Sequence, residues 1–84
     1  MTDYIKFNVV HGYFDMGNRH ILSLRGCPEI VYGYFNCSTN KLISLQYSPK
    51  KVYDDYYCGY NPGNFTIKDV KRYCKVHKKI CLVR

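Results

Sequence analysis

Three side chains near the C-terminus have the types and spacing that could hold a metal ion. Cys74, His77 and Cys81 lie within eight residues of one another, and Cys58 could supply a fourth ligand. Thiolates and imidazoles are the usual ligands of tetrahedral zinc. Against this interpretation, the spacing matches no common zinc motif well, and the pattern after residue 66 places Cys74 on a buried helix face. We therefore favour reduced structural thiols over a metal site and expect no cofactor.

Catalytic chemistry has little support in the sequence. Asp15 is expected on a surface, but no histidine or second acid is placed to work with it, and His11 and His20 lack partners. The chain contains no glycine-rich phosphate loop and neither the G-x-S-x-G nor the H-E-x-x-H motif. We expect a protein without enzymatic activity.

The formal net charge of +7 is concentrated at one end of the chain. Residues 66–84 carry seven Lys or Arg and one acid, whereas residues 1–65 carry six bases and five acids. A basic surface attracts phosphate backbones or acidic protein surfaces. A solvated helix face would have the same composition, but placement of the first four bases on one helix side favours binding. The candidate nucleic-acid-binding residues are Lys68, Lys71, Arg72, Lys75, Lys78 and Lys79.

An internal repeat indicates which elements must position these side chains. Residues 12–31 read GYFDMGNRHILSLRGCPEIV and residues 33–52 read GYFNCSTNKLISLQYSPKKV, so a shift of 21 residues superposes them without a gap. The same shift places Asn40 on Asn61 in a third copy. A period of this length is typical of solenoids, in which each repeat packs on the next.

The middle copy fits the leucine-rich repeat pattern, with five residues at its marked inward places. Alternation along a strand points every second side chain into the core, and a side-chain amide at the strand end can satisfy turn backbone groups. The marked residues are Tyr32, Phe35, Cys37, Asn40 and Leu42. We predict a stacked core column of Phe14, Phe35 and Tyr56, flanked by Met16, Cys37 and Cys58.

The intervening strand residues should form an exposed, tyrosine-rich face. Tyrosine offers a large contact area at low entropic cost and is favoured at interfaces. Ten Tyr in 84 residues is a high content, although some of these rings would only fill the rim of a thin core. The candidate partner-binding residues are Tyr13, Asp15, Arg19, Tyr34, Asn36 and Tyr57.

The length predicts one domain, residues 1–84. The expected strands and helix place it in the α+β class. We expect a short leucine-rich-repeat-like solenoid of about two and a half coils. Residues 4–10 would form a strand cap, a helix would begin at Thr66 with Asp69 completing a capping box, and residues 80–83 would add a final strand. The expected segments are an N-terminal cap (1–11), repeat 1 (12–32), repeat 2 (33–53), partial repeat 3 (54–65) and a basic C-terminal cap (66–84).

The run V-x-G-x-F-x-C-S-x-N-x-L-x-S-L in residues 31–45 resembles the short leucine-rich-like repeats of phage and prophage proteins. The ending N-F-T-I-K-D-V-K-R-Y-C resembles the helix that closes those arrays, so the resemblance covers roughly residues 9–76. Arg19 in place of the repeated Asn, and an apparent insertion at Pro62-Gly63, depart from the pattern.

The resemblance extends to small anti-CRISPR proteins and implies an inhibitor of a bacterial defence protein. The specific expectation is a type VI RNA-guided RNA nuclease, bound at or near its guide-RNA site, with guide RNA as a possible second partner. Alternatives are a direct RNA-binding module or a self-associating structural protein. No apolar run is long enough to span a membrane, so we expect no membrane association. We expect a monomer or weak homodimer in the cytoplasm of the infected or lysogenic bacterium.

Overall fold

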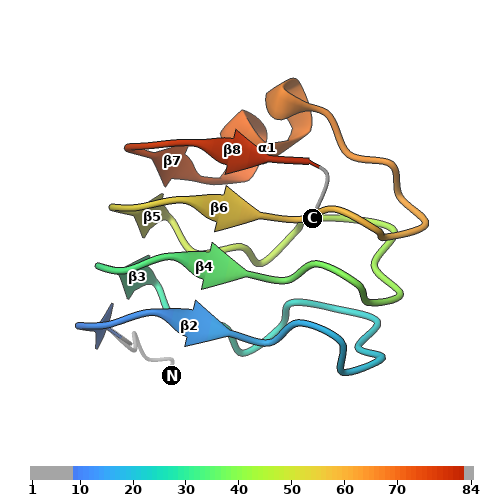
Figure 1. Cartoon of the computed structure of the whole chain (residues 1–84), viewed down its shortest axis with the longest axis horizontal. Helices are drawn as coiled ribbons and strands as arrows, with labels where there is room; N and C mark the ends of the chain where they lie inside the picture. Colours follow the sequence, from blue (N-terminus) through green and yellow to red (C-terminus); the bar gives the residue numbers. More distant parts are fainter. Residues whose placement is uncertain (1–8, 83–84) are drawn as a thin grey trace, which may run out of the picture.

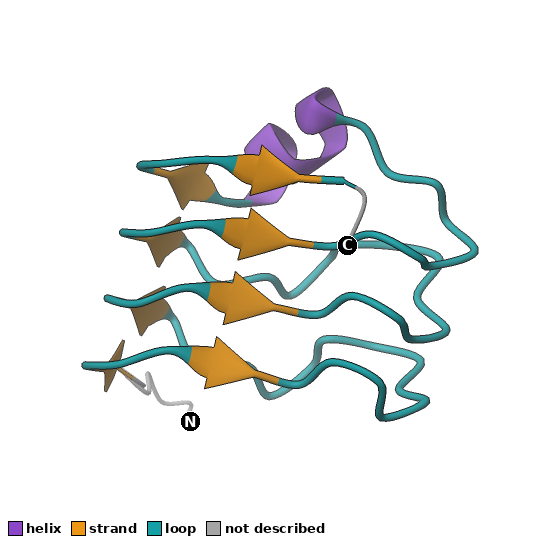
Figure 2. Cartoon of the chain, in the orientation of Figure 1, coloured by secondary structure: helices purple, strands orange, loops and turns teal. Residues whose placement is uncertain are grey.

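The computed structural model describes residues 9–82, which wind into a β-solenoid of about three turns. Each turn adds one short strand to each of two four-stranded parallel sheets, ordered β1-β3-β5-β7 and β2-β4-β6-β8 (Figure 1). The strands are β1 (Val9–Val10), β2 (Phe14–Asp15), β3 (Ile30–Val31), β4 (Phe35–Asn36), β5 (Lys51–Val52), β6 (Tyr56–Tyr57), β7 (Lys75–Val76) and β8 (Ile80–Cys81). Most of every turn is loop rather than strand (Figure 2).

The strand register confirms the predicted repeat. Phe14 pairs with Phe35, and Phe35 pairs with Tyr56, which is the 21-residue shift read from the sequence. Tyr56 then pairs with Ile80, so the third turn contains three more residues than the first two. The predicted insertion therefore lies in the third turn, in the segment that also contains the helix.

The predicted core column is present. The rings of Phe14 and Phe35 are parallel, with centroids 6.1 Å apart, and Tyr56 lies 5.0 Å beyond Phe35. Phe35, Tyr56 and Cys37 are fully buried, while Phe14 is only partly covered because it lies in the first turn. The Tyr56 hydroxyl shares a 2.7 Å hydrogen bond with Ser48, so the one phenol in the core is satisfied.

The leucine-rich repeat template was wrong at its first inward position. Tyr32 was expected in the core but is 43% exposed, and Val31 is buried in its place. The cause is a corner between the two sheets, which follows Tyr32 and directs it outward. At this corner a Cβ on Gly33 would lie 2.7 Å from the carbonyl carbon of Gly12 and the nitrogen of Tyr13, so glycine permits the close approach here. The corner itself recurs in the next turns with Asp54 and Lys78 at the same place.

A ladder of asparagine side chains supports the turns after β4 and β6, as predicted. Oδ1 of Asn40 accepts the backbone N–H groups of Arg19 and Ile21 at 2.9 and 3.1 Å. Its amide nitrogen donates to three carbonyl oxygens, those of Met16, Cys37 and Ser38. Asn61 repeats the arrangement one turn later. Arg19 occupies the equivalent place in the first turn and is exposed.

The third turn closes with the only helix in residues 9–82, α1 (Ile67–Tyr73). Thr66 caps its N-terminus, and the Asp69 carboxylate accepts the Thr66 N–H, so the predicted capping box is confirmed. Val70 is fully buried against the core, as expected from the helical spacing. Ile67 was expected on that buried face but is 48% exposed, because the helix is only seven residues long and packs mainly through its second turn.

The segment after the helix differs from the simple cap that the sequence predicted. Residues 75–81 begin a fourth turn, in which β7 pairs with β5 and β8 pairs with β6. Lys75 was expected on the helix, but it lies in β7. At the other end, Val9 and Val10 of the predicted strand cap form β1, whereas residues 4–8 and Val83 lie outside the described residues.

Candidate functional site

The outward side of the β2-β4-β6-β8 sheet brings most of the predicted partner-binding residues together. We call this surface the sheet face; its members are Tyr13, Asp15, Tyr34, Asn36, Asp55, Tyr57 and Lys79. Tyr13 and Asp15 flank the inward Phe14, and register with the next strand places Asn36 directly beside Asp15. Tyr13 is 63% exposed, so the face presents its rings to solvent. A shallow hollow between Asp15 and Tyr57 lies in its centre.

Hydrogen bonds hold the part of the sheet face on β2 and β4 in one arrangement. Asn36 Nδ2 donates to Asp15 Oδ1 at 3.1 Å, and the Tyr34 hydroxyl donates to Asp15 Oδ2 at 3.4 Å. The Asn36 side chain also accepts from Ser38, through both its N–H and its hydroxyl. Partial desolvation and the Asp15 charge raise the pKa of Tyr34, so its hydroxyl remains a donor at neutral pH.

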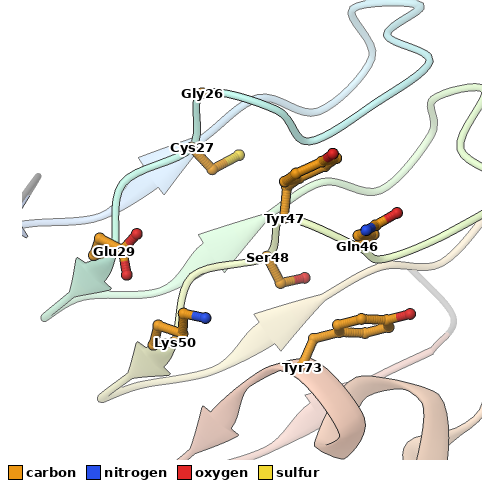
Figure 3. A pocket seen from close by; sticks show the side chains of 8 residues that line it. All are labelled: Gly26, Cys27, Glu29, Gln46, Tyr47, Ser48, Lys50 and Tyr73. Atoms are coloured by element: carbon orange, nitrogen blue, oxygen red, sulfur yellow. The ribbon is translucent and has the colours of Figure 1, made fainter. Parts of the chain in front are cut away.

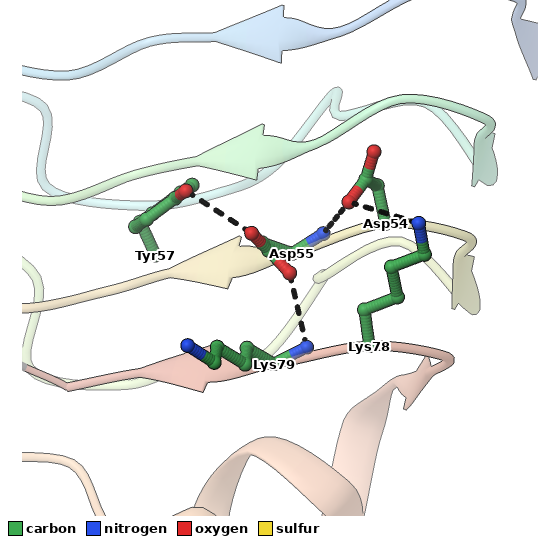
Figure 4. Close-up of polar contacts among 5 residues, drawn as sticks. All are labelled: Asp54, Asp55, Tyr57, Lys78 and Lys79. Atoms are coloured by element: carbon green, nitrogen blue, oxygen red, sulfur yellow. Dashed lines mark hydrogen bonds and ion pairs between the residues drawn. The ribbon is translucent and has the colours of Figure 1, made fainter.

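A second acid organises the part of the face near the C-terminus (Figure 4). Asp55 accepts the Tyr57 hydroxyl at 3.3 Å and the backbone N–H of Lys79 at 3.0 Å. Beside it, Lys78 Nζ lies 4.0 Å from Asp54 Oδ1, in an exposed pair. Lys79 therefore belongs to the sheet face, although the sequence placed it in the basic cap. Asp55 was missed because its repeat partners are Tyr13 and Tyr34, which suggested no acid there.

Aromatic rings stack along the corner between the two sheets. His11, Tyr32, Tyr53 and His77 follow β1, β3, β5 and β7 and form a continuous column, with centroid separations of 5.2, 4.7 and 4.4 Å. Tyr13 and Tyr34 form a parallel pair 4.9 Å apart on the adjoining sheet face. The interior rings of the corner column therefore have both faces covered, and only their edges and hydroxyls reach solvent. The sequence signal for this column was an aromatic residue directly after a valine, repeated as Val10-His11, Val31-Tyr32 and Val52-Tyr53.

Arg19, the remaining candidate for partner binding, is not part of this surface. It lies in the loop after β2, where its backbone N–H donates to Asn40, and its exposed side chain lines none of the hollows described here. Arg19 occupies the ladder position of the first turn, equivalent to Asn40, and this position lies away from the sheet face.

The basic candidates are distributed over two surfaces rather than one. Lys68, Lys71 and Arg72 lie on helix α1, Lys75 lies in β7, and Lys78 and Lys79 lie between β7 and β8. Register also brings Lys51 of β5 beside Lys75, an adjacency that the sequence reading did not identify. Within residues 9–82, the only side-chain ion pair is that of Lys78. The helix and β7 therefore present unneutralised positive charge.

A second concave surface lies next to helix α1, and we call it the helix face: residues 25–29, residues 46–50 and α1. Its largest hollow has a volume of about 560 Å³ and is lined by residues of three successive turns, among them Tyr47, Lys50 and Tyr73 (Figure 3). Figure 3 shows the two phenol hydroxyls directed to the same side of the hollow. A second hollow of about 490 Å³ lies on the other side of Tyr73, against Arg72 and Lys75.

Three cysteines, Cys37, Cys58 and Cys74, are buried in the core, whereas Cys27 and Cys81 are partly buried. Burial raises the pKa of the Cys58 and Cys74 thiols to about 12 and that of Cys27 to about 11, so all three are protonated at neutral pH. Cys74 caps the end of α1, whereas His77 is stacked on Tyr53. Among the described residues, no three His, Cys, Asp or Glu side chains are grouped to hold a metal ion.

Comparisons with known proteins give no family for this chain: no family model, curated protein or solved structure matches it. Among residues 9–82, no helix has the length and apolar character needed to cross a membrane. The sheet face and the helix face are therefore the candidate binding surfaces of the protein.

Proposed function

We propose that the protein is a non-enzymatic binding protein whose sheet face docks on another protein. The observation that carries this proposal is the pre-organisation of the face. Asp15 and Asp55 fix the hydroxyls of the partly exposed Tyr34 and Tyr57 through hydrogen bonds, and the exposed Tyr13 stacks on Tyr34. A face that is already ordered loses little conformational entropy on docking, and tyrosine is a frequent source of interface affinity.

Two features favour protein over nucleic acid as the partner of this face. Bases bind aromatic side chains by stacking on a free ring face, but the central Tyr34 has Tyr13 stacked on it at 4.9 Å and Tyr57 edge-on at 5.7 Å. The carboxylates of Asp15 and Asp55 would also repel a phosphate backbone. Phenol hydroxyls and ring edges beside hydrogen-bonded carboxylates are instead suited to the polar and apolar groups of a protein surface.

The finer proposal concerns the target. On the resemblance of the repeat and closing helix to phage and prophage proteins, we take the partner to be a bacterial defence protein, specifically a type VI RNA-guided RNA nuclease bound near its guide RNA. Inhibition by occupancy requires no catalytic residues, which agrees with the absence of a catalytic motif in the sequence. The site of action would be the cytoplasm of the infected bacterium.

Cleavage of a target RNA by a reconstituted type VI nuclease and guide RNA tests the proposal. Added protein should inhibit cleavage in proportion to occupancy. Tyr13→Ala should weaken inhibition about tenfold, as expected for loss of an interface anchor worth more than about 1 kcal/mol. Tyr60→Ala is the matched control, because Tyr60 is 62% exposed, against 63% for Tyr13, and lies off the sheet face.

Two results would contradict the proposal at different levels. Failure to inhibit the nuclease, with the protein folded, would reject the named target but leave the sheet face as a protein-binding surface. Equal loss of inhibition in the Tyr13 and Tyr60 variants would instead reject the sheet face as the working surface. The Tyr34→Ala variant adds a kinetic test, since loss of a docked ring should chiefly raise the dissociation rate.

A further inference from the structure

We propose that the helix face binds single-stranded nucleic acid, with one base in the hollow between Tyr47 and Tyr73 and the adjoining phosphates on nearby cations. The inference is independent of the sheet face and of the proposed protein target. It rests on three observations: two hollows that share Tyr73, the half-exposed ring of Tyr47 and the cations without ion-pair partners.

The helix face carries two open hollows that share Tyr73 rather than a single closed pocket. The hollow of about 560 Å³ at Tyr47 and that of about 490 Å³ at Lys75 meet at Tyr73, which lines both. Each volume is within the range of about 300–1,000 Å³ that is typical of sites for small organic ligands. Two adjoining sites of this size suit successive units of a strand better than one compact ligand.

The ring of Tyr47 is available for stacking, unlike those of the corner column, whereas Tyr73 is partly buried against the core. Among residues 9–82, no aromatic ring stacks on Tyr47 or on Tyr73. The guanidinium of Arg25 lies 5.5 Å from the Tyr47 centroid and covers one face of that ring. A base could therefore take up the remaining face, in the way that sequence-tolerant single-strand sites use tyrosine.

Cations outnumber acids around the two hollows, where the nearby acids are Glu29 and Asp69. Lys50 lines the first hollow and Lys71, Arg72 and Lys75 line the second, and none of them has an ion-pair partner within residues 9–82. Lys51 is directly beside Lys75 in neighbouring strands, an arrangement of like charges that costs stability unless an anion compensates it. Phosphate groups are the anions that such a row of separate cations would neutralise.

The acidic and amide groups of the first hollow suit a base edge. Glu29 and Gln46 line it together with the two tyrosines. A glutamate can accept an exocyclic amino group, and a glutamine can pair with two adjacent groups of a base. The other acid near the hollows, Asp69, is occupied by the Thr66 cap, which lowers its pKa and keeps it ionised.

The backbone of Tyr47 allows a clean test of its side chain. Its φ is +74°, in the left-handed region, and the equivalent residue one turn earlier is Gly26 with φ +91°. Glycine adopts this conformation without strain, so Gly can replace Tyr47 at little backbone cost. Tyr60 also has a positive φ, and Tyr47 differs from it in placing a half-exposed ring against the first hollow.

Fluorescence anisotropy of a labelled eight-nucleotide oligouridylate, titrated with the purified protein alone, tests this inference. Loss of one stacked base should weaken binding by about 5- to 100-fold in the Tyr47→Gly variant. Because the substitution also relieves backbone strain, the melting temperature should stay the same or rise. Tyr60→Gly is the matched control: Tyr60 has φ +53°, is 62% exposed and lines neither hollow, so its affinity should not change.

Charge variants and competitors complete the design. Lys50→Met and Lys75→Met should each reduce the slope of log affinity against log salt by about 0.7, whereas the remote Lys41→Met should not. Free uridine monophosphate and polyglutamate should compete poorly with the strand. The inference is overturned if the oligonucleotide does not bind at low salt, if both Tyr variants behave alike, or if either competitor is as effective as the strand. Since no nuclease is present, these outcomes leave the proposal for the sheet face unaffected.

Discussion

Replacement of Asn40 by alanine should destabilise the fold far more than loss of an ordinary polar side chain. The Asn40 side chain is 8% exposed and makes five hydrogen bonds to the backbone. The carbonyls of Cys37 and Ser38 would keep a second donor, from Asn61 and from the N–H of Asn18. The N–H groups of Arg19 and Ile21 would lose their acceptor. Each such unsatisfied group costs about 1–3 kcal/mol, and partial access of water places the total near 2–4 kcal/mol.

That cost is a large part of the stability available to a chain of this size. A domain of 84 residues is expected to have an unfolding free energy of about 4–13 kcal/mol. Urea unfolding followed by circular dichroism would measure the change, with Gln46→Ala as the control. Gln46 is exposed, so its removal should change the unfolding free energy by less than about 0.5 kcal/mol. A loss below about 1 kcal/mol for Asn40→Ala would refute the view that the ladder is a principal support of the turns.

Two further outcomes are expected of the folded chain. Phe35→Ala removes a fully buried ring from the centre of the aromatic column, and a cost of about 3–5 kcal/mol should abolish cooperative thermal unfolding; a cooperative melt would contradict the core assignment. Alkaline pH should also destabilise the protein. Burial raises the pKa of the Cys58 and Cys74 thiols from 9.0 to about 12, so the unfolded chain releases these protons first. Their contribution is complete below about pH 9 and declines up to about pH 12, by at most about 1.4 kcal/mol per pH unit for each thiol. Urea midpoints at about pH 8 and pH 10 would show the decline, and equal midpoints would exclude it.

The repeat was sufficient to predict the core column and the ladder, because aromatic residues in the column and asparagines in the ladder recur at one spacing. Once Phe14, Phe35 and Tyr56 share a register, alternation along the strand determines which neighbours point inward. The position of helix α1 also followed from local signals, since Thr66 and Asp69 form a capping box that requires no tertiary context. The exposed face of Tyr13, Asp15, Tyr34, Asn36 and Tyr57 followed from the same alternation.

The remaining features depend on geometry that a linear pattern does not contain. The leucine-rich template assumes one strand in each turn, whereas every turn here has a corner and a second strand, which forms the second sheet. This corner exposes Tyr32 and buries Val31. Lys75 was misplaced because the helix ends at Tyr73, where Cys74 returns to an extended backbone, although Lys75 continues the helical spacing of the basic residues. The larger hollow of the helix face is lined by residues up to 47 positions apart, from Gly26 to Tyr73, so no local sequence motif predicts it.

The same three-residue extension that interrupts the repeat also explains why the two surfaces differ. In the first two turns equal spacing stacks each ring on its equivalent, which covers the faces of Tyr32 and Tyr53 and leaves a regular surface of ring edges. In the third turn the extra length is wound into α1, so Tyr73 has no equivalent ring beneath it and stands across the hollow from Tyr47. Regular repetition thus covers the ring faces of the corner column, and its interruption leaves two hollows lined by Tyr47, Tyr73 and cations that have no ion-pair partner within residues 9–82. The two proposed binding activities therefore require different parts of the solenoid, and variants at Tyr13 and Tyr47 should separate them.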